Sequence, residues 1–256
     1  MHAVRGRIEY PGPFPGSMVR FGSAGPTKET VLRVFMPIIF IAFVLLIIVA
    51  AVFASVAEKK RREAFAALAQ RLGLRYRPER DHGVARQFAF LDKLRGGSNR
   101  YAYNILEGTY KGHEVMAFDY HYETHSTDSK GRRQTHHHHF SFFILFHDLE
   151  CPELRIYPEG FFSKLGQMMG FDDIDFESVE FSKAFCVRSK DKKFAYDICH
   201  ARMMEYLLRH RNLSIELEGR CVSVSADSRL KPEEVPGRLD QLVEIRELFP
   251  KYLYDA

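Results

Sequence analysis

The longest unbroken apolar pattern in the chain lies near its start. Residues 34–57 read VFMPIIFIAFVLLIIVAAVFASVA and contain no charged side chain. At about 1.5 Å per residue, a helix of this length spans roughly 36 Å, more than the hydrocarbon core of about 30 Å. The run is also longer than the apolar part of a cleaved signal peptide, and the charged stretch EKKRRE follows it directly. We therefore predict a transmembrane helix at 34–57.

The polar residues on either side of this helix predict its orientation. The 20 residues after it contain seven Lys or Arg, whereas the 20 before it contain three. Basic residues favour the cytoplasmic side of a membrane, so we expect the N-terminus outside and the C-terminal part in the cytoplasm. The lipid bilayer is then the first expected partner. Anionic lipid head groups are a further one, through a basic cluster made of Lys59, Lys60, Arg61 and Arg62.

The pattern changes on both sides of the membrane segment. Residues 1–30 are rich in Pro and Gly without apolar periodicity, which predicts a flexible tail. Residues 58–73 have a helical period, with apolar positions at Phe65, Leu68, Ala69 and Leu72 and a glycine at the end. We expect this juxtamembrane helix to dock onto a domain formed by residues 74–256.

The domain begins with strand-like alternation. A short strand near 74–77 and a helical turn near 84–93 precede two hairpins, RYAYNILEGTY-KG-HEVMAFDYHYETH and its return strand QTHHHHFSFFILF. Shorter strands follow at LRIYPE and AFCVRS, and the segments LSIELEG and RCVSVSA predict another hairpin around Gly219. Strands joined by short turns are typical of an antiparallel sheet.

Two helical patterns are interleaved with these strands. The first is FAYDICHARMMEYLLRH, with a predicted buried stripe of Met203, Met204, Leu207 and Leu208. The second runs from about Glu233 or Gly237 to Phe249 and carries Leu239, Leu242, Val243 and Leu248. The fold class predicted for the chain is α+β: one N-terminal transmembrane helix, then an antiparallel-sheet domain with interleaved helices.

Four consecutive histidines, His136 to His139, open the return strand of the second hairpin. The even positions of both strands are apolar or aromatic from Met116 to Tyr122 and from Phe140 to Phe146. One core face therefore requires even residues to pair with even residues. The odd face then brings together His121, Glu123, His137 and His139, while His136 and His138 point to the other face.

This odd face has three interpretations. An antiparallel hairpin with one face on the core and the other in water shows the same alternation, and the sequence favours this interpretation without a cofactor. The alternative is a metal-dependent enzyme or metal sensor that binds zinc or another divalent metal through His121, Glu123, His137 and His139. A third idea is a pH-responsive surface, because imidazoles titrate near neutrality.

Other candidate chemistry is weak. The net charge of +4 is too small to indicate nucleic acid, and the four cysteines form no C-x-x-C pair, which predicts buried, reduced thiols. The acidic stretch GFDDIDFES lacks the spacing of a calcium loop, and Cys199 and His200 would point about 100° apart on a helix. We predict no catalytic residues, and the question of enzymatic activity stays open.

The segment FESVEFSKAFCVRSKDKKFAYDICHARMMEYLL carries a resemblance to a known family. It resembles the F-E-S-x-E-F-x-K-x-F-x-V core of an uncharacterised family of bacterial membrane-anchored proteins, through Glu177, Glu180, Phe181, Lys183, Phe185, Val187, Asp191, Ala195, Met204, Glu205 and Leu207. The resemblance implies an N-terminal membrane anchor with a cytoplasmic α+β domain, but no reaction, and we expect the anchor to lie in the cell inner membrane. We therefore expect a single-pass protein with a cytoplasmic binding or scaffolding domain whose protein partner the sequence does not identify.

Overall fold

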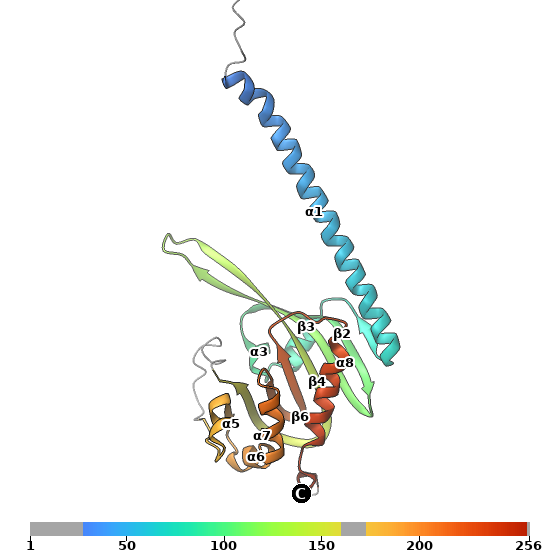
Figure 1. The fold of residues 1–256 in the computed structure, drawn as a ribbon, viewed down its shortest axis with the longest axis vertical. Helices are drawn as coiled ribbons and strands as arrows, with labels where there is room; N and C mark the ends of the chain where they lie inside the picture. The colour runs from blue at the N-terminus through green and yellow to red at the C-terminus, as the bar shows by residue number, and fades with distance from the viewer. Residues whose placement is uncertain (1–27, 160–172, 255–256) are drawn as a thin grey trace, which may run out of the picture. The chain divides into compact units, whose positions relative to one another are not determined.

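The computed structural model describes residues 28–159 and 173–254, and the chain divides into two compact units (Figure 1). The first unit is Met1–Ser55 and the second is Val56–Ala256. Most of the predicted flexible tail lies outside the described residues. Its last three residues, 28–30, belong instead to the first helix, because the Pro and Gly that would interrupt a helix all precede them.

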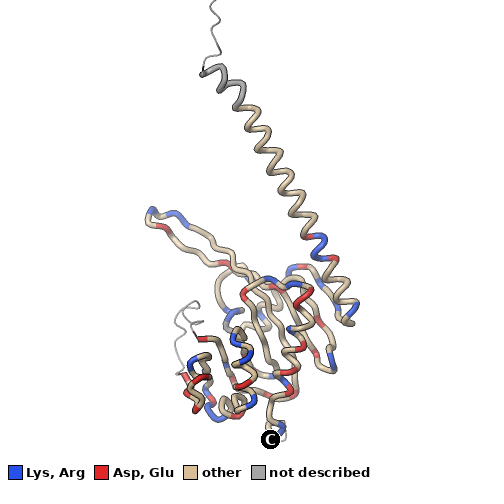
Figure 2. Tube along the Cα trace, in the orientation of Figure 1, with Lys and Arg blue, Asp and Glu red and all other residues tan. Residues whose placement is uncertain are grey.

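Helix α1, Lys28–Leu72, contains the whole predicted membrane segment. Its apolar side chains are exposed, for example Phe40, Leu46 and Phe53, which are 65–71% accessible. Figure 2 shows that this part of the helix carries no charged residue and that a basic cluster follows it. The helix is long and apolar enough to cross a membrane, so it is a candidate membrane anchor.

The second unit is built on one antiparallel sheet of six strands. The strands are paired in the order β1-β2-β3-β4-β5, and β6 also pairs with β4. Their bounds are Arg75–Arg77 for β1, Ser98–Tyr110 for β2, His113–Thr127 for β3, Arg133–Pro158 for β4, Phe185–Ser189 for β5 and Ser214–Ala226 for β6. With the helices described below, this sheet confirms the predicted α+β class.

Strand β4 is longer than the sequence indicates, because the predicted return strand and LRIYPE are parts of one 26-residue strand. The predicted hairpin around Gly219 is wrong. β6 is a single strand that pairs with β4 on both sides of Gly219, from Ser141–Ala226 to Ile156–Ile215. Gly219 has a φ of +58° and pairs with Cys151, and the register shifts on both sides of this pair because β4 carries the extra residues; Gly219 thus lies opposite an irregularity of β4 and not in a turn.

Strands β3 and β4 extend beyond the rest of the sheet as a two-stranded ribbon (Figure 1). The first residue of β2, Ser98, pairs with Glu123, and the last residue of β6, Ala226, pairs with Ser141. Residues 124–136, which we call the arm, therefore pair only with each other among the described strands.

Seven short helices complete the described part of the second unit. Their bounds are His82–Gln87 for α2, Asp92–Arg95 for α3, Val179–Ala184 for α5, Lys192–Ile198 for α6, Ala201–Arg209 for α7, Val235–Glu247 for α8 and Lys251–Leu253 for the 3-10 helix η1. The predicted helix over FAYDICHARMMEYLLRH is thus two helices. His200 separates them because its side chain accepts a hydrogen bond from the Met203 amide and so caps α7.

Both faces of the sheet are buried, each in its own core. The larger core joins the odd face of β3 and β4 to α1 and to α5–α8, and its α1 members are the predicted residues Phe65, Leu68 and Ala69. The smaller core joins the even face, including Phe118, Tyr120, Phe140 and Phe142, to α2 and the residues around α3. The juxtamembrane part of α1 is therefore packed into the domain.

Candidate metal centre at the histidine hairpin

The register between β3 and β4 is the one that the aromatic pattern predicts. Tyr120 pairs with Phe140, and even positions oppose even positions along the whole hairpin. On the other face His121 pairs with His139, and Glu123 pairs with His137. All four predicted ligand residues therefore lie in one patch.

This patch is not simply a water-facing surface. Asp119 is fully buried, because Arg61 of α1 and the Leu230 main chain contact it, and His121 is 3% exposed against the ring of Tyr101. The expectation that this whole face lies in water is wrong for these two residues. Exposure rises along the strands toward the arm, from the buried His121 through the half-buried Glu123 to the exposed His137.

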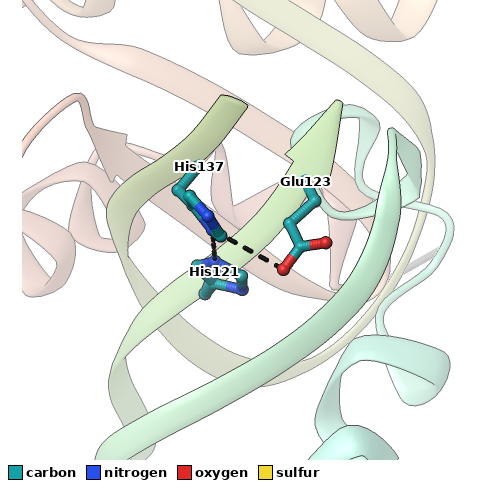
Figure 3. A group of neighbouring side chains, drawn as sticks. All are labelled: His121, Glu123 and His137. Atoms are coloured by element: carbon teal, nitrogen blue, oxygen red, sulfur yellow. Dashed lines mark hydrogen bonds and ion pairs between the residues drawn. The ribbon is translucent and has the colours of Figure 1, made fainter. Parts of the chain in front are cut away.

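Three of the four side chains converge (Figure 3). One ligand atom from each of His121, Glu123 and His137 lies within 4.8 Å of the other two. The His137 Nδ1 atom is 3.1 Å from His121 Nε2 and 3.5 Å from Glu123 Oε1. Zn–N and Zn–O bonds of about 2.0–2.2 Å at tetrahedral angles place ligand atoms about 3.3 Å apart, so these separations fit a metal ion.

His139, the fourth predicted ligand, does not join this group in the described structure. Its Nδ1 atom lies 3.2 Å from the Tyr103 hydroxyl, although its ring is 4.9 Å from the ring of His121. His121 is held on its other side by Tyr101, whose ring stacks on it at 4.5 Å and itself lies 4.6 Å below the guanidinium of Arg80.

Asn99 at the start of β2 contacts two members of the group. Its side-chain amide donates to Glu123 Oε1 over 2.6 Å, and its main-chain carbonyl lies 3.2 Å from His121 Nδ1. Sequence reasoning missed Asn99. The stretch GGSNR is a turn signal, but nothing in its pattern shows that the turn ends against the odd face of the hairpin.

The environment lowers the pKa of two of these groups. Burial lowers the pKa of His121, which keeps its imidazole neutral and able to bind a cation. The hydrogen bond from Asn99 lowers the pKa of Glu123, which keeps its carboxylate ionised. A neutral imidazole beside a carboxylate is the donor chemistry that zinc and similar divalent ions bind.

The other two histidines of the run lie on the opposite face, as predicted. His138 stacks on Tyr122 at 4.5 Å and lies 2.8 Å from the Thr124 hydroxyl, and His136 lies 2.8 Å from the Ser126 hydroxyl. Each is thus a cross-strand partner of a residue of β3. Four consecutive histidines supply only one ligand, His137, to the group of three.

The remaining candidates from the sequence are the four cysteines and the acidic stretch, and their surroundings indicate structural roles. All four cysteines are buried and free, and burial raises the pKa of Cys151, Cys186 and Cys221 to about 12, which makes them unreactive. Cys199 lies at the break between α6 and α7 rather than inside one helix, and it is buried too. In the acidic stretch Asp173 binds Arg188, and residues 170–172 lie outside the described residues.

The fold and the site define an α+β protein with a candidate membrane anchor and a candidate metal centre. No family model matches the chain, and no curated protein matches it, so the family resemblance of residues 176–208 stays a prediction. Among solved structures, it is similar to the crystal structure of the mycobacterial trehalose monomycolate transport factor A, TtfA. That likeness has 12% identity and a TM-score of 0.49 and covers 75% of this chain and 95% of that one. A likeness at this level transfers no function.

Proposed function

We propose that the chain is a single-pass protein that holds a binding or scaffolding domain at the cytoplasmic face of a bacterial inner membrane. The observation that carries this proposal is the continuity of α1. The helix passes from its exposed apolar part into the core of the domain without a break. A domain joined in this way stays next to the bilayer, where it can bind partners at the membrane surface.

The contacts of the juxtamembrane segment support the same proposal. Arg61 donates to the buried Asp119 carboxylate over 2.7 Å and to the Leu230 carbonyl over 2.8 Å, which fixes the helix to the sheet. Arg61 is therefore engaged within the domain. The lipid contacts that we propose for the basic cluster rest on Lys59, Lys60 and Arg62, which are exposed; each is worth about 1 kcal/mol near an anionic surface.

The orientation is tested with single introduced thiols. In bacterial cells that express the full chain, Ser17→Cys and Ser129→Cys are labelled with a membrane-impermeant maleimide. The four native cysteines are buried, so their background labelling is low. We expect labelling of Ser17→Cys in intact cells and of Ser129→Cys only after permeabilisation. The opposite pattern, or labelling of both in intact cells, would contradict the cytoplasmic placement.

A second candidate function, metal sensing or metal-dependent catalysis, is favoured by one specific observation. The group of His121, Glu123 and His137 offers two imidazoles and a carboxylate at separations that fit a divalent ion. We propose that this patch binds zinc or a similar divalent metal. Metal analysis of untagged full-length protein purified without chelator tests it. We expect one equivalent per chain, and a metal content no higher than that of a His121→Gln variant would exclude this function.

A further inference from the structure

We propose that Asn99 is a positioning residue for an open, three-ligand metal site made of His121, Glu123 and His137. This inference rests on the proposed metal-binding function. It adds that one residue holds the ligands in place before the metal binds, and that some coordination positions of the metal stay free. The metal class is a divalent first-row transition ion, with Zn²⁺ as the probe, because two histidines and one carboxylate form its usual open donor set.

Asn99 acts on two ligands at once. Its main-chain carbonyl only accepts hydrogen bonds, so the His121 Nδ1–H donates to it, and the Nε2 lone pair faces the site. Its side-chain amide donates to Glu123 Oε1 and holds the carboxylate on the same side. Such outer contacts fix the tautomer and direction of metal ligands, and removing one lowers metal affinity by about 10- to 100-fold.

In the absence of metal, the tautomer of His121 determines where the hydrogen between the His121 and His137 rings lies. Since His121 Nε2 accepts, the hydrogen between the two rings belongs to His137 Nδ1, which lies 3.1 Å away. That hydrogen therefore occupies the position between His121, Glu123 and His137 where a cation would bind. On metal binding it moves to the other ring nitrogen of His137, whose side chain is 58% exposed to water.

The backbone before the site holds Asn99 in this position. Asn99 has a φ of +48°, a conformation that Asn tolerates better than most residues, and the register of β2 shifts between Ser98 and Tyr101. Gly97, at a φ of +73°, lies so close to the hairpin that an added Cβ would be 2.5 Å from the Glu123 carbonyl oxygen. The segment 97–99 is thus built against β3, the strand that carries two of the three ligands, His121 and Glu123.

The site is open because His139 is held elsewhere. Its Nδ1 atom faces the Tyr103 hydroxyl, and no fourth His, Cys, Asp or Glu among the described residues joins the group. Closed structural zinc sites use four protein ligands, whereas three-ligand sites keep a position for water or another exchangeable ligand. His137 at the exposed edge gives that ligand access from solvent.

The test uses Zn²⁺ titration of untagged full-length protein in detergent. Asn99→Gly is the central variant, because glycine keeps the positive φ and the main-chain carbonyl and removes only the side-chain amide. We expect Asn99→Gly to bind at least tenfold more weakly and His137→Gln to lose stoichiometric binding. Two control variants are His139→Gln, on the Tyr103 side, and His138→Gln, on the opposite face. We expect the Zn²⁺ affinity of both to stay within threefold of that of the unmodified chain.

A spectroscopic readout separates positioning from folding. With Co²⁺ in place of Zn²⁺ at saturation, the visible spectrum of Asn99→Gly is expected to differ from that of the unmodified chain, while the metal-free thermal unfolding curves coincide. Unchanged affinity and spectrum in Asn99→Gly would overturn the role of Asn99. A loss in His139→Gln equal to that in His137→Gln would overturn the open site. If the unmodified chain itself binds no zinc, the metal function fails, which is a distinct result.

Discussion

Asp119 is a fully buried carboxylate of the sheet that accepts hydrogen bonds from three different residues. Its two oxygens accept hydrogen bonds from the Arg61 guanidinium, the Asn104 side-chain amide and the Leu230 main-chain amide over 2.7–2.9 Å. A fully buried carboxylate needs such partners, because an uncompensated buried charge is strongly destabilising. One acidic side chain therefore joins the membrane-proximal helix, the strand β2 and the segment before α8.

Replacing Arg61 tests this junction. Arg61→Met leaves the Asp119 charge buried without its ionic partner, and we expect the free energy of unfolding to fall by about 2–4 kcal/mol. The matched control is Arg62→Met, which removes only an exposed pair with Glu58 and is expected to cost below about 1 kcal/mol. Urea unfolding of both variants in detergent provides the comparison, and equal losses would show that Arg61 is not a special contact.

His147 offers a test by pH. Burial, with the nearby charge of Arg246, lowers its pKa to about 4 in the folded protein, whereas an unfolded chain has a value of about 6.5. Between these values the unfolded state binds more protons, so the stability due to neutral His147 falls as the pH drops from 7 to 4. The full effect is about 3 kcal/mol.

Urea unfolding at several pH values measures this slope. In His147→Gln we expect a shallower loss of stability between pH 7 and 4 than in the unmodified chain. His113→Gln removes a partly exposed imidazole of the same region and is expected to keep the original slope. Parallel curves for the unmodified chain and His147→Gln would contradict the lowered pKa.

At the scale of the elements, the sequence predicts the pairing of two strands well where both strands carry the same alternation of apolar and polar residues. The aromatic alternation of residues 116–122 and 140–146 predicts the register of β3 and β4 because a slip by one residue would turn every ring of one strand to the opposite face of the sheet. Prediction from the sequence fails where contacts with distant parts of the chain determine the local structure. The sequence around Gly219 predicts a turn, but β6 continues through it, since β4 is long enough to pair on both sides of it.

For the candidate metal site, too, the sequence predicts some contacts and not others. Cross-strand alternation places His121, Glu123, His137 and His139 together, and it excludes His136 and His138. Alternation does not show that Tyr103 holds His139 or that Asn99 contacts Glu123, because these contacts come from β2, whose irregular start has no periodic signal. The burial of His121 also depends on β2, because the ring of Tyr101 stacks on it.

Substitutions at two glycines test how closely the start of β2 packs against the hairpin. Gly97 and Gly112 both have positive φ, +73° and +83°, but only at Gly97 would a Cβ meet other atoms, at 2.4 Å from the Tyr122 ring. Changing either to Ala strains the backbone by about 1–2 kcal/mol. We expect Gly97→Ala to cost about 1–3 kcal/mol more than Gly112→Ala in thermal or urea unfolding, because of overpacking. Equal costs would mean that β2 begins farther from the hairpin.

At the scale of the whole molecule, the boundary between the two units lies inside α1. The second unit starts at Val56, so it keeps the helical residues that pack into its core, including Phe65 and Leu68. The part that spans the membrane in our proposal and the part that completes the fold are therefore consecutive segments of one helix, and they can be separated by truncation.

Two truncations test this division. A chain that starts at residue 56 is expected to be soluble and to unfold cooperatively. A chain that starts at residue 73 lacks Phe65, Leu68 and Ala69, and it loses about 1.5–3 kcal/mol for each large buried side chain. We expect it to be aggregated or partly unfolded by circular dichroism and gel filtration. If both truncated chains fold equally well, α1 is an anchor only and contributes nothing to the domain.

The arm has a consequence for self-association. Residues 124–136 pair only with each other among the described strands, so both edges of this ribbon lie outside the rest of the sheet, and such edges are templates for pairing with another strand. Charged side chains oppose this, and the turn of the arm carries Lys130, Arg132 and Arg133 (Figure 2). We therefore expect these charges to disfavour edge-to-edge pairing between the ribbons of two copies of the chain.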